Sequence, residues 1–266
     1  MKHIFSKQNK ALLSELVRTD FKLRYQGSVL GYTWSLLKPL LLFLTLYIIF
    51  VKFLKLGAGI PHFPIYLLLG IVLWTFFAEI TSQGLSSIVG RGDLIRKIRI
   101  PRWMIVLSAS ISALINLGLN LLIVFIFMIA NNVDLLITSV WLPLLLVQIY
   151  VLGLGVALIL ATAYVKYRDV SHIWEVVLQA GFYVTPILFP LTLITNVTYQ
   201  KLLLLNPMAQ TIQDARYALV THETLTISSV FGSGYYRLIP VIMSVLILIV
   251  GVLYFKKQSK YFAENL

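Results

Sequence analysis

An acidic side chain inside an apolar stretch is the first candidate for chemistry in this chain. Glu79 sits in the apolar run of residues 65–89, and no second acid lies deep in another such run. An ionisable group at that depth is costly, and a proton relay is one use that would justify it. The alternative is a glutamate hydrogen-bonded within a helix interface, near Thr75, Ser82 or Gln83. Because a relay needs partners in other runs, the sequence favours the hydrogen-bonded alternative.

Residues for metal binding and nucleotide hydrolysis are missing from the sequence. The four histidines are scattered over the connections between apolar runs, and there is no cysteine. We therefore expect no metal site and no disulfide. The phosphate-binding motif Gly-x-x-x-x-Gly-Lys-Ser/Thr does not occur, and no connection is long enough for an ATPase domain. The sequence thus predicts no catalysis and no cofactor in this chain, with any ATP-driven work done by a separate subunit.

A basic segment, residues 91–102, combines cations with apolar side chains. We predict a short helix there, begun by Asp93 and ended by Pro101, with an apolar knob surrounded by cations. The candidate docking residues are Asp93, Leu94, Ile95, Arg96, Lys97, Ile98 and Arg99. Such a surface suits the docking of a soluble partner. The alternative is a loop that only sets membrane topology, which needs the cations but not the apolar knob.

The composition of the chain indicates a membrane protein. Hydrophobic residues make up 59% of the 266 and charged residues 12%, whereas a soluble domain carries about 25% charged residues. We predict an all-α integral membrane protein with one transmembrane domain, residues 1–266. Its six membrane-spanning helices are expected at residues 29–53, 65–89, 103–130, 137–165, 173–193 and 238–255.

The cations lie in short segments between these apolar runs. The net charge of +12 therefore indicates contact with anionic membrane lipids rather than with nucleic acid. With six spans, most of the 22 Lys and Arg residues fall on the side of the N-terminus, which predicts both termini in the cytoplasm.

Residues 8–27 predict an amphipathic helix that lies in the membrane interface. Leu12, Leu16 and Val17 fall on one arc of a helical wheel, and Arg18 falls on the opposite arc. Asp20 and Arg24 are exceptions, because they interrupt the apolar arc.

Residues 195–236 are too long for a plain loop between spans. Asn206 followed by Pro207 is typical of a helix N-cap and first helical position. We predict two short helices, residues 198–205 and 207–220, at or dipping into the far interface. Neither is long enough to span a membrane.

Six sequence features, taken in order, resemble one known family. They are Leu16-Val17-Arg18 with Phe21-Lys22-Leu23-Arg24-Tyr25, then Ser28-Val29-Leu30-Gly31-Tyr32-Thr33-Trp34 with Pro39, Leu94-Ile95-Arg96-Lys97 with Pro101-Arg102, Tyr167-Arg168-Asp169-Val170, Thr185-Pro186-Ile187, and Leu205-Asn206-Pro207. Each match is weak alone, but their order and spacing are specific. The chain is similar over nearly its whole length to permease subunits of type-2 ABC exporters for cell-surface polysaccharides, including O-antigen, teichoic-acid and capsule exporters.

The resemblance implies a homodimer of six-span subunits paired with two copies of an ATP-binding cassette subunit. It implies a bacterial or archaeal cytoplasmic (inner) membrane, and export of a glycan on a polyprenyl diphosphate or similar lipid carrier. Residues 91–102 resemble the coupling helix that sits on the ATPase. The helices within 195–236 resemble outer gate helices, with Tyr199, Asn206, Pro207 and Gln210 as candidate residues. Contacts to the lipid head group at the inner leaflet are then expected from Lys22, Arg24, Tyr25 and Arg102.

Two alternatives stay open from the sequence. One is a type-2 ABC permease for a drug or a simple lipid, which shares the architecture. The other is a proton-coupled carrier or membrane enzyme that uses Glu79.

Overall fold

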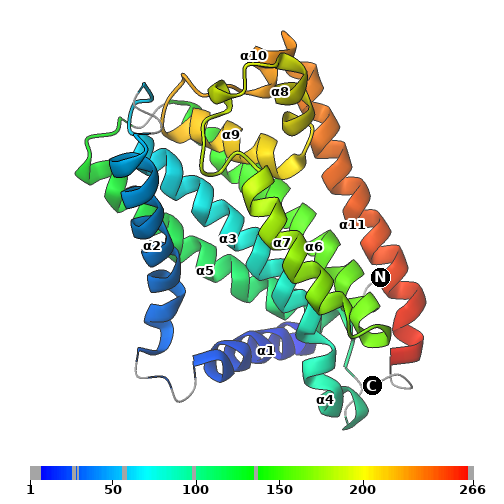
Figure 1. Cartoon of the computed structure of the whole chain (residues 1–266). Coiled ribbons are helices and arrows are strands. Elements are labelled where there is room, and N and C mark those ends of the chain that lie inside the picture. The colour runs from blue at the N-terminus through cyan, green and yellow to red at the C-terminus, as the bar shows by residue number, and fades with distance from the viewer. Residues whose placement is uncertain are drawn as a thin grey trace.

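The computed structural model describes residues 7–25, 28, 30–55, 59–97, 100–134 and 137–262 (Figure 1). Every regular element in these residues is helical. Five helices there are long and apolar enough to cross a membrane: Trp34–Phe53, Phe63–Ser87, Trp103–Ala130, Ile137–Lys166 and Gly234–Tyr261. They confirm the predicted spans one, two, three, four and six.

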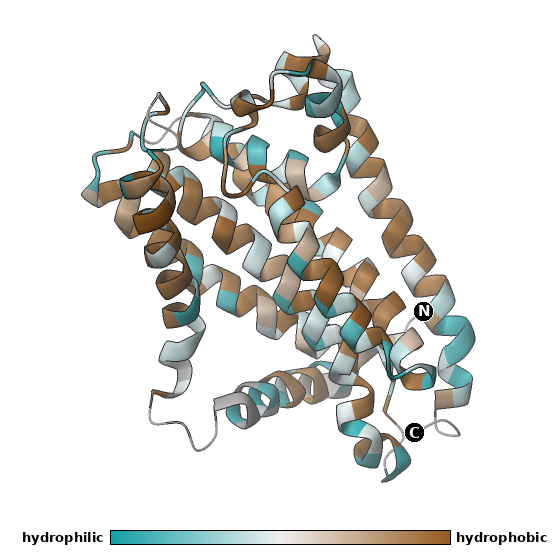
Figure 2. Cartoon of the chain, in the orientation of Figure 1, coloured by the Kyte–Doolittle hydropathy of each residue, from teal (hydrophilic) through white to brown (hydrophobic). Residues whose placement is uncertain are grey.

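The long helices contain α2 (Trp34–Leu46), α3 (Phe63–Ser87), α5 (Trp103–Ala130), α6 (Leu142–Lys166) and α11 (Leu238–Gln258). A π-helical continuation, Tyr47–Phe53, extends α2, and short 3-10 turns extend α6 and α11. Apolar residues cover α11 along most of its length, with hydrophilic residues at its last turns (Figure 2).

The predicted fifth span is wrong at its C-terminal end. α7 runs over Val170–Val184, so the helix stops nine residues before the expected end at residue 193. Thr185 is extended, with φ −71° and ψ 136°, because a residue that precedes proline is disfavoured in the helical region. With 15 residues, α7 is about 23 Å long, shorter than a hydrocarbon core of about 30 Å.

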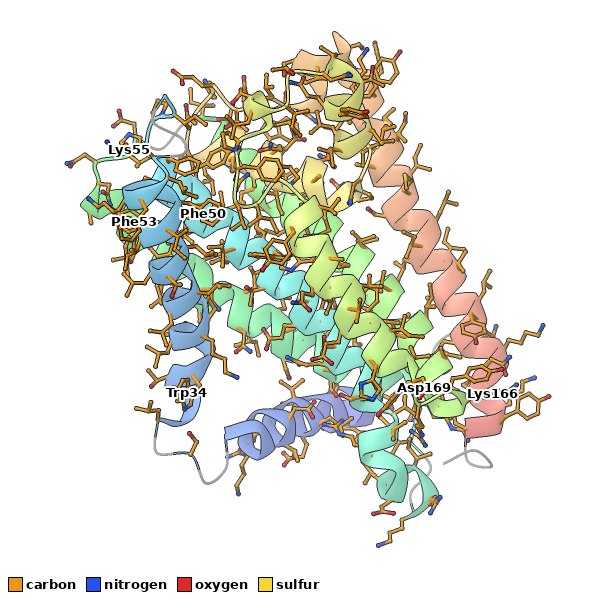
Figure 3. The ribbon with its side chains drawn as sticks, viewed as in Figure 1. Trp34, Phe50, Phe53, Lys55, Lys166 and Asp169 are labelled. Carbon is orange, nitrogen blue, oxygen red and sulfur yellow. The ribbon has the colours of Figure 1, made fainter. Side chains whose placement is uncertain are left out.

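The two ends of the helix bundle differ in character. α1 (Lys7–Tyr25), α4 (Gly92–Lys97) and the last turns of α11 lie at one end, which we call the basic side (Figure 1). Lys166 and Asp169 lie at this same end, whereas Phe53 and Lys55 lie at the opposite end, which we call the far side (Figure 3). The far side is covered by α8 (Val197–Leu204), α9 (Pro207–Leu219) and α10 (Ile227–Phe231).

α1 agrees with the predicted interfacial helix. It lies across the basic-side ends of the spans rather than along them and packs against α5 (Figure 1). Leu16 on its apolar arc is buried, whereas Arg18 on the polar arc is exposed. The amphipathic pattern of the sequence therefore corresponds to two faces with different surroundings in the structure.

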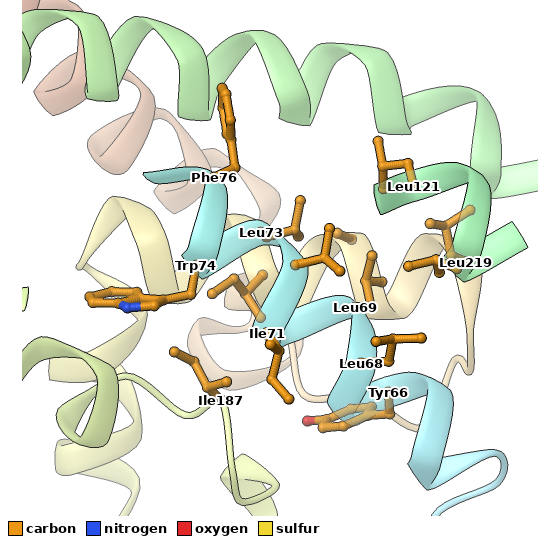
Figure 4. Close-up of a cluster of buried hydrophobic side chains, with 14 of the residues drawn as sticks. Tyr66, Leu68, Leu69, Ile71, Leu73, Trp74, Phe76, Leu121, Ile187 and Leu219 are labelled. Carbon is orange, nitrogen blue, oxygen red and sulfur yellow. The ribbon is translucent and has the colours of Figure 1, made fainter. Parts of the chain in front are cut away.

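α3 is the centre of the core. It contacts α2, α5, α6, α7 and α9, and its side chains from Ile65 to Leu73 are almost wholly buried. Leu121 of α5 and Leu219 of α9 belong to the same buried cluster, as does Ile187 of the segment that follows α7 (Figure 4). A far-side helix and an extended segment are thus packed directly on the central span.

Small residues allow α6 to approach two neighbours closely. A Cβ atom added at Gly153 would meet Ile80 of α3, and one added at Gly84 of α3 would meet Ala157 of α6. On the other face of α6, Gly155 lies against α11, where an added Cβ would be 2.6 Å from the backbone nitrogen of Leu248. Close packing of this kind is a main source of helix association in membranes, since lipid is as apolar as the side chains.

Replacing Gly155 with alanine is therefore expected to separate α6 from α11 and to lower the free energy of unfolding by about 1–3 kcal/mol. The clash is with backbone atoms, which have little freedom to move. Thermal denaturation of the purified protein in nanodiscs measures the effect. Gly118→Ala in α5 is the matched control, because its added Cβ would meet no atom within 4 Å. Equal melting temperatures for the two variants would contradict the prediction.

The predicted helices between residues 195 and 236 are confirmed as helices. α8 and α9 begin and end within one residue of the predicted bounds, and α10 was not predicted. Asn206 caps α9 as expected, since its Oδ1 accepts a hydrogen bond from the Met208 backbone nitrogen at 2.9 Å. A gating role for these helices stays a prediction.

Candidate functional site

The basic segment forms the short helix α4 at the basic side, projecting beyond the ends of the spans (Figure 1). Asp93, Arg96 and Lys97 are exposed. Leu94 and Ile95 are half-buried, and Ile95 packs against the apolar cluster formed by α5, α6 and α11. Two residues predicted for docking, Ile98 and Arg99, lie outside the described residues. The described part of α4 thus offers a charged outer surface, with its apolar side turned toward the bundle.

A polar contact ties α1 to the start of the basic segment. The Arg91 guanidinium forms an ion pair with Asp20 of α1 and donates a hydrogen bond to the Leu16 carbonyl at 3.4 Å. Ser108 of α5 donates to the second Asp20 oxygen at 3.1 Å. Asp20 interrupts the apolar arc of α1 because that arc faces protein at this position. The sequence showed that Asp20 is an acid on an apolar face, but it did not identify Arg91 as its partner.

Glu79 lines a cavity of about 590 Å³ between α2, α3 and α5. Apolar surface makes up much of the lining, to which the polar side chains of Lys38, Glu79, Ser82, Gln83 and Asn116 and the aromatic side chain of Trp34 also contribute. Trp34 lies at the basic-side foot of α2 (Figure 3). Asn116 is in the middle of α5, so the cavity extends from the basic side into the bundle.

Hydrogen bonds fix the Glu79 side chain in this cavity. Gln83, one turn further along α3, donates from Nε2 to Glu79 Oε1 at 2.6 Å, and Asn116 donates from Nδ2 to the same oxygen. Glu79 is thus hydrogen-bonded within the bundle, with Gln83 as one of the expected partners, and its functional role stays a prediction. Sequence reasoning missed Asn116. Its signal is a pair of asparagines, Asn116 and Asn120, four residues apart in an apolar span.

The four residues expected to contact a lipid head group are not all on one element. Lys22 is exposed on α1, and the side chains of Arg24 and Tyr25 lie outside the described ones. Arg102 is at the start of α5, where its guanidinium lies 6.0 Å from the Phe262 ring centroid. Arg102 lines a separate cavity of about 990 Å³ with Lys256 of α11. The structure therefore assigns Arg102 to the α11 side of the bundle.

The gate-helix candidates differ in exposure. Tyr199 on α8 is exposed, whereas Pro207 and Gln210 on α9 are buried. Gln210 accepts a hydrogen bond from Gln148 of α6 at 2.6 Å and donates one to Asp214 at 2.6 Å. α9 is thus held to α6 by buried amides.

The structure adds one buried cation that the sequence did not single out. Arg216 of α9 is fully buried (0% exposed). Its guanidinium donates to the backbone carbonyls of Tyr66 at 2.9 Å, Pro186 at 2.6 Å and Ile187 at 2.7 Å. It also lies 3.7 Å from the Tyr66 ring centroid, a close cation–π contact. Gly70 of α3 leaves room for the guanidinium, because a Cβ there would overlap its Nη2 atom.

This arginine explains why the segment after α7 can be non-helical and buried. Backbone carbonyls removed from water need donors, and a guanidinium supplies several in one plane. The carbonyls of Pro186 and Ile187, which follow the end of α7, accept hydrogen bonds from Arg216 of α9. α9 therefore connects α3 to the end of α7.

A second charged pair holds α9 to the start of α11. Arg237 lies 2.8 Å (Nε to Oδ2) from Asp214, and a second guanidinium nitrogen donates to Oδ1 at 3.1 Å. Burial raises the pKa of the Asp214 carboxyl above its ordinary value, and the charge of Arg237 and the Gln210 hydrogen bond oppose this shift. The far-side helix is thus bound to α3, α6, the end of α7 and α11.

Comparisons with known proteins agree with this architecture. Residues 11–220 match the ABC2_membrane family, described as ABC-2 type transporter. The chain is 30% identical over 217 residues to the O-antigen export system permease protein RfbA of Myxococcus xanthus, covering 81% of this chain and 83% of that protein. It is 27% identical over 259 residues to RfbA of Klebsiella pneumoniae, covering 96% and 95% of the two chains.

A further relative has a different named cargo. The polysialic acid transport protein KpsM of Escherichia coli is 24% identical over 213 residues, covering 79% of this chain and 82% of that protein. Because the family match covers most of a chain built from long apolar helices, this multi-pass membrane protein belongs to the ABC-2 type transporter family.

Proposed function

We propose that this chain is the permease of an ATP-driven exporter that moves a lipid-linked polysaccharide across the cytoplasmic (inner) membrane. The observation that carries the proposal is the likeness to O-antigen export permeases over 96% of the chain. The similarity to a polysialic acid transport protein supports the same class of cargo. A permease for a drug or a simple lipid would share the family but not these relatives.

The membrane topology in this proposal has six crossings. The crossing that adds to the five long helices, fifth in chain order, is α7 together with the extended segment that leads to α8. Support comes from the placement of α1 and the last turns of α11 on the same side of the bundle, which requires an even number of crossings (Figure 1). The excess of cations on that side supports its assignment to the cytoplasm.

ATP hydrolysis is assigned to a separate ATP-binding cassette subunit, two copies of which would pair with a homodimer of this chain. The exposed surface of α4 (Asp93, Arg96 and Lys97) is the proposed docking site on the cytoplasmic side. The ion pair between Arg91 and Asp20 would transmit a displacement of α4 to α1, because it joins the two elements directly.

The cargo in this proposal is a glycan on a polyprenyl diphosphate or similar carrier. Lys22, Arg24 and Tyr25 on α1 would face the head group at the inner leaflet, where cations attract a diphosphate. Arg102 and Lys256, which line a mainly apolar cavity at the same side, would form a second cationic site.

Reversing the charge of α4 tests the docking step. Arg96→Glu combined with Lys97→Glu is expected to lower the yield of the ATPase subunit that co-purifies with this chain at least fivefold, because both side chains are exposed. Lys257→Glu with Lys260→Glu is the matched control, since these exposed cations lie at the end of α11 on the same side. Ile95 is unsuitable for this test, because it packs against the bundle.

The measurement is co-purification with the ATP-binding cassette subunit of the same exporter, followed by staining of cell-surface polysaccharide. Undiminished co-purification of the α4 variant would contradict the docking site. A wild-type complex that places no polysaccharide on the cell surface would contradict the proposed function itself.

A further inference from the structure

The cavity between α2, α3 and α5 contains two buried acceptors that no other described residue satisfies. Gln83 and Asn116 both turn their NH₂ groups toward Glu79 Oε1. Their carbonyl oxygens, Gln83 Oε1 and Asn116 Oδ1, are buried and have no hydrogen-bond partner among the described residues. Asn116 is only 2% exposed. A buried acceptor without a partner is energetically unfavourable, so this pair indicates a ligand that brings donors.

The chemistry of the lining narrows the class of ligand. A metal or alkali cation fits poorly, because the Lys38 side chain lines the same cavity and two amide NH₂ groups occupy one Glu79 oxygen. An acyl chain fits poorly as well, because it has no donor for the two buried amide oxygens. Hydroxyl groups meet the requirement, since each can donate to an amide oxygen and accept from Lys38 or Ser82.

The volume of the cavity and the tryptophan in its lining agree with a sugar. Its volume of about 590 Å³ lies within the range of about 300–1,000 Å³ that is usual for small-molecule sites. Trp34, at the basic-side foot of α2, contributes an aromatic side chain to the lining, and Asn116 contributes an amide from the middle of α5. A pyranose could therefore contact the indole with its apolar face and the amides with its hydroxyls.

The geometry points to a saccharide-binding site formed by Trp34, Lys38, Gln83 and Asn116, in which the two orphan amide oxygens accept hydroxyl protons of a sugar unit within the membrane. This inference rests on the proposed function and adds to it a specific contact between glycan and protein. Glu79 acts there as a positioning residue, because it orients both amides with their oxygens free. Proton transfer by Glu79 has no part in it.

The first experiment changes the cavity and measures export. Asn116→Leu removes an acceptor at similar volume, and Ala78→Trp fills the cavity from α3. Each is expected to reduce cell-surface polysaccharide at least tenfold in a strain carrying the chain with its own glycan-synthesis genes, with the ATPase subunit still co-purifying. Leu119→Trp is the matched control for added bulk, because Leu119 is 36% exposed on α5. Normal export by both cavity variants would overturn the inference.

The second experiment uses the absence of cysteine from the sequence. Ser82→Cys places a single thiol in the cavity, and Ser14→Cys places one on the exposed arc of α1 as a control. The experiment uses an ATPase subunit that binds but cannot hydrolyse ATP, which is intended to hold the substrate in the permease. Labelling of the Ser82→Cys variant by a membrane-permeant maleimide should then be at least fivefold slower in cells that make the glycan than in cells that do not.

The outcomes distinguish a failure of the saccharide site from a failure of the proposed function. Equal labelling of the Ser82→Cys variant with and without glycan, in a strain whose wild-type chain exports polysaccharide, would overturn the saccharide site and leave the proposed function standing. Failure of the wild-type chain to export any polysaccharide would overturn the proposed function and this site with it. Slower labelling of Ser82→Cys alone, with Ser14→Cys unchanged, supports the site.

Discussion

Replacing Arg216 with methionine is expected to lower the free energy of unfolding by about 3–5 kcal/mol and to abolish export. Methionine fills similar space but donates no hydrogen bond, so the carbonyls of Tyr66, Pro186 and Ile187 would lose their donor while staying buried. The thermal transition of the purified protein in nanodiscs measures the stability, and surface staining measures export.

Two further variants show whether the loss of stability comes from removing the Arg216 guanidinium itself. Arg168→Met is the matched control, because Arg168 also lies over a tyrosine ring, at 5.3 Å from Tyr164, but is exposed. It is expected to melt like the wild type. Arg216→Lys should give an intermediate loss, since one ammonium group cannot match the planar donor set. A melting temperature for Arg216→Met within error of the wild type would show that these hydrogen bonds are unimportant.

Breaking the contact between Arg91 and Asp20 is expected to have the next largest effect. Arg91→Gln leaves a largely buried Asp20 carboxylate, 22% exposed, without its cation. The cost is about 2–4 kcal/mol, concentrated on the docking of α1. Hydrogen exchange should show faster exchange of the α1 amides, and export should fall with the ATPase subunit still bound.

Reversal of the pair distinguishes a specific contact from a general loss of charge. Asp20→Arg combined with Arg91→Asp keeps both charges and should recover part of the α1 protection, whereas each single change should not. Glu15→Gln is the control on the exposed arc of α1 and should leave exchange unchanged. If the α1 amides exchange as fast in the Asp20→Arg/Arg91→Asp double variant as in the Arg91→Gln variant, the ion pair does not position α1.

The fold was largely predictable because membrane-spanning helices can be recognised in a sequence by their length and their apolar composition. The third span, Trp103–Ala130, agrees with its predicted bounds at both ends. The failure at α7 came from counting apolar residues through Pro186 and Pro190 as one helix. Hydropathy cannot separate a helix from an apolar extended segment whose carbonyls are satisfied from elsewhere, and the donor, Arg216, is 30 residues away from Pro186 in the chain.

The candidate site was predictable only where its partners share an element. Gln83 is one turn from Glu79 on α3, so a helical wheel finds it. Asn116 is 37 residues away on another helix, and no periodicity links the two. Arg216 was missed for a related reason. α9 is buried on nearly every face, so its amphipathic pattern did not show which polar residues would face protein.

The break after α7 also has a consequence for biosynthesis. When residues 170–187 leave the ribosome, the helix is too short to cross the bilayer alone, and the carbonyls of Pro186 and Ile187 still need donors. The guanidinium that supplies those donors is translated about thirty residues later. We therefore expect α7 to reach its final depth only after α9 has been made, so that α7 and α9 settle into the bundle together.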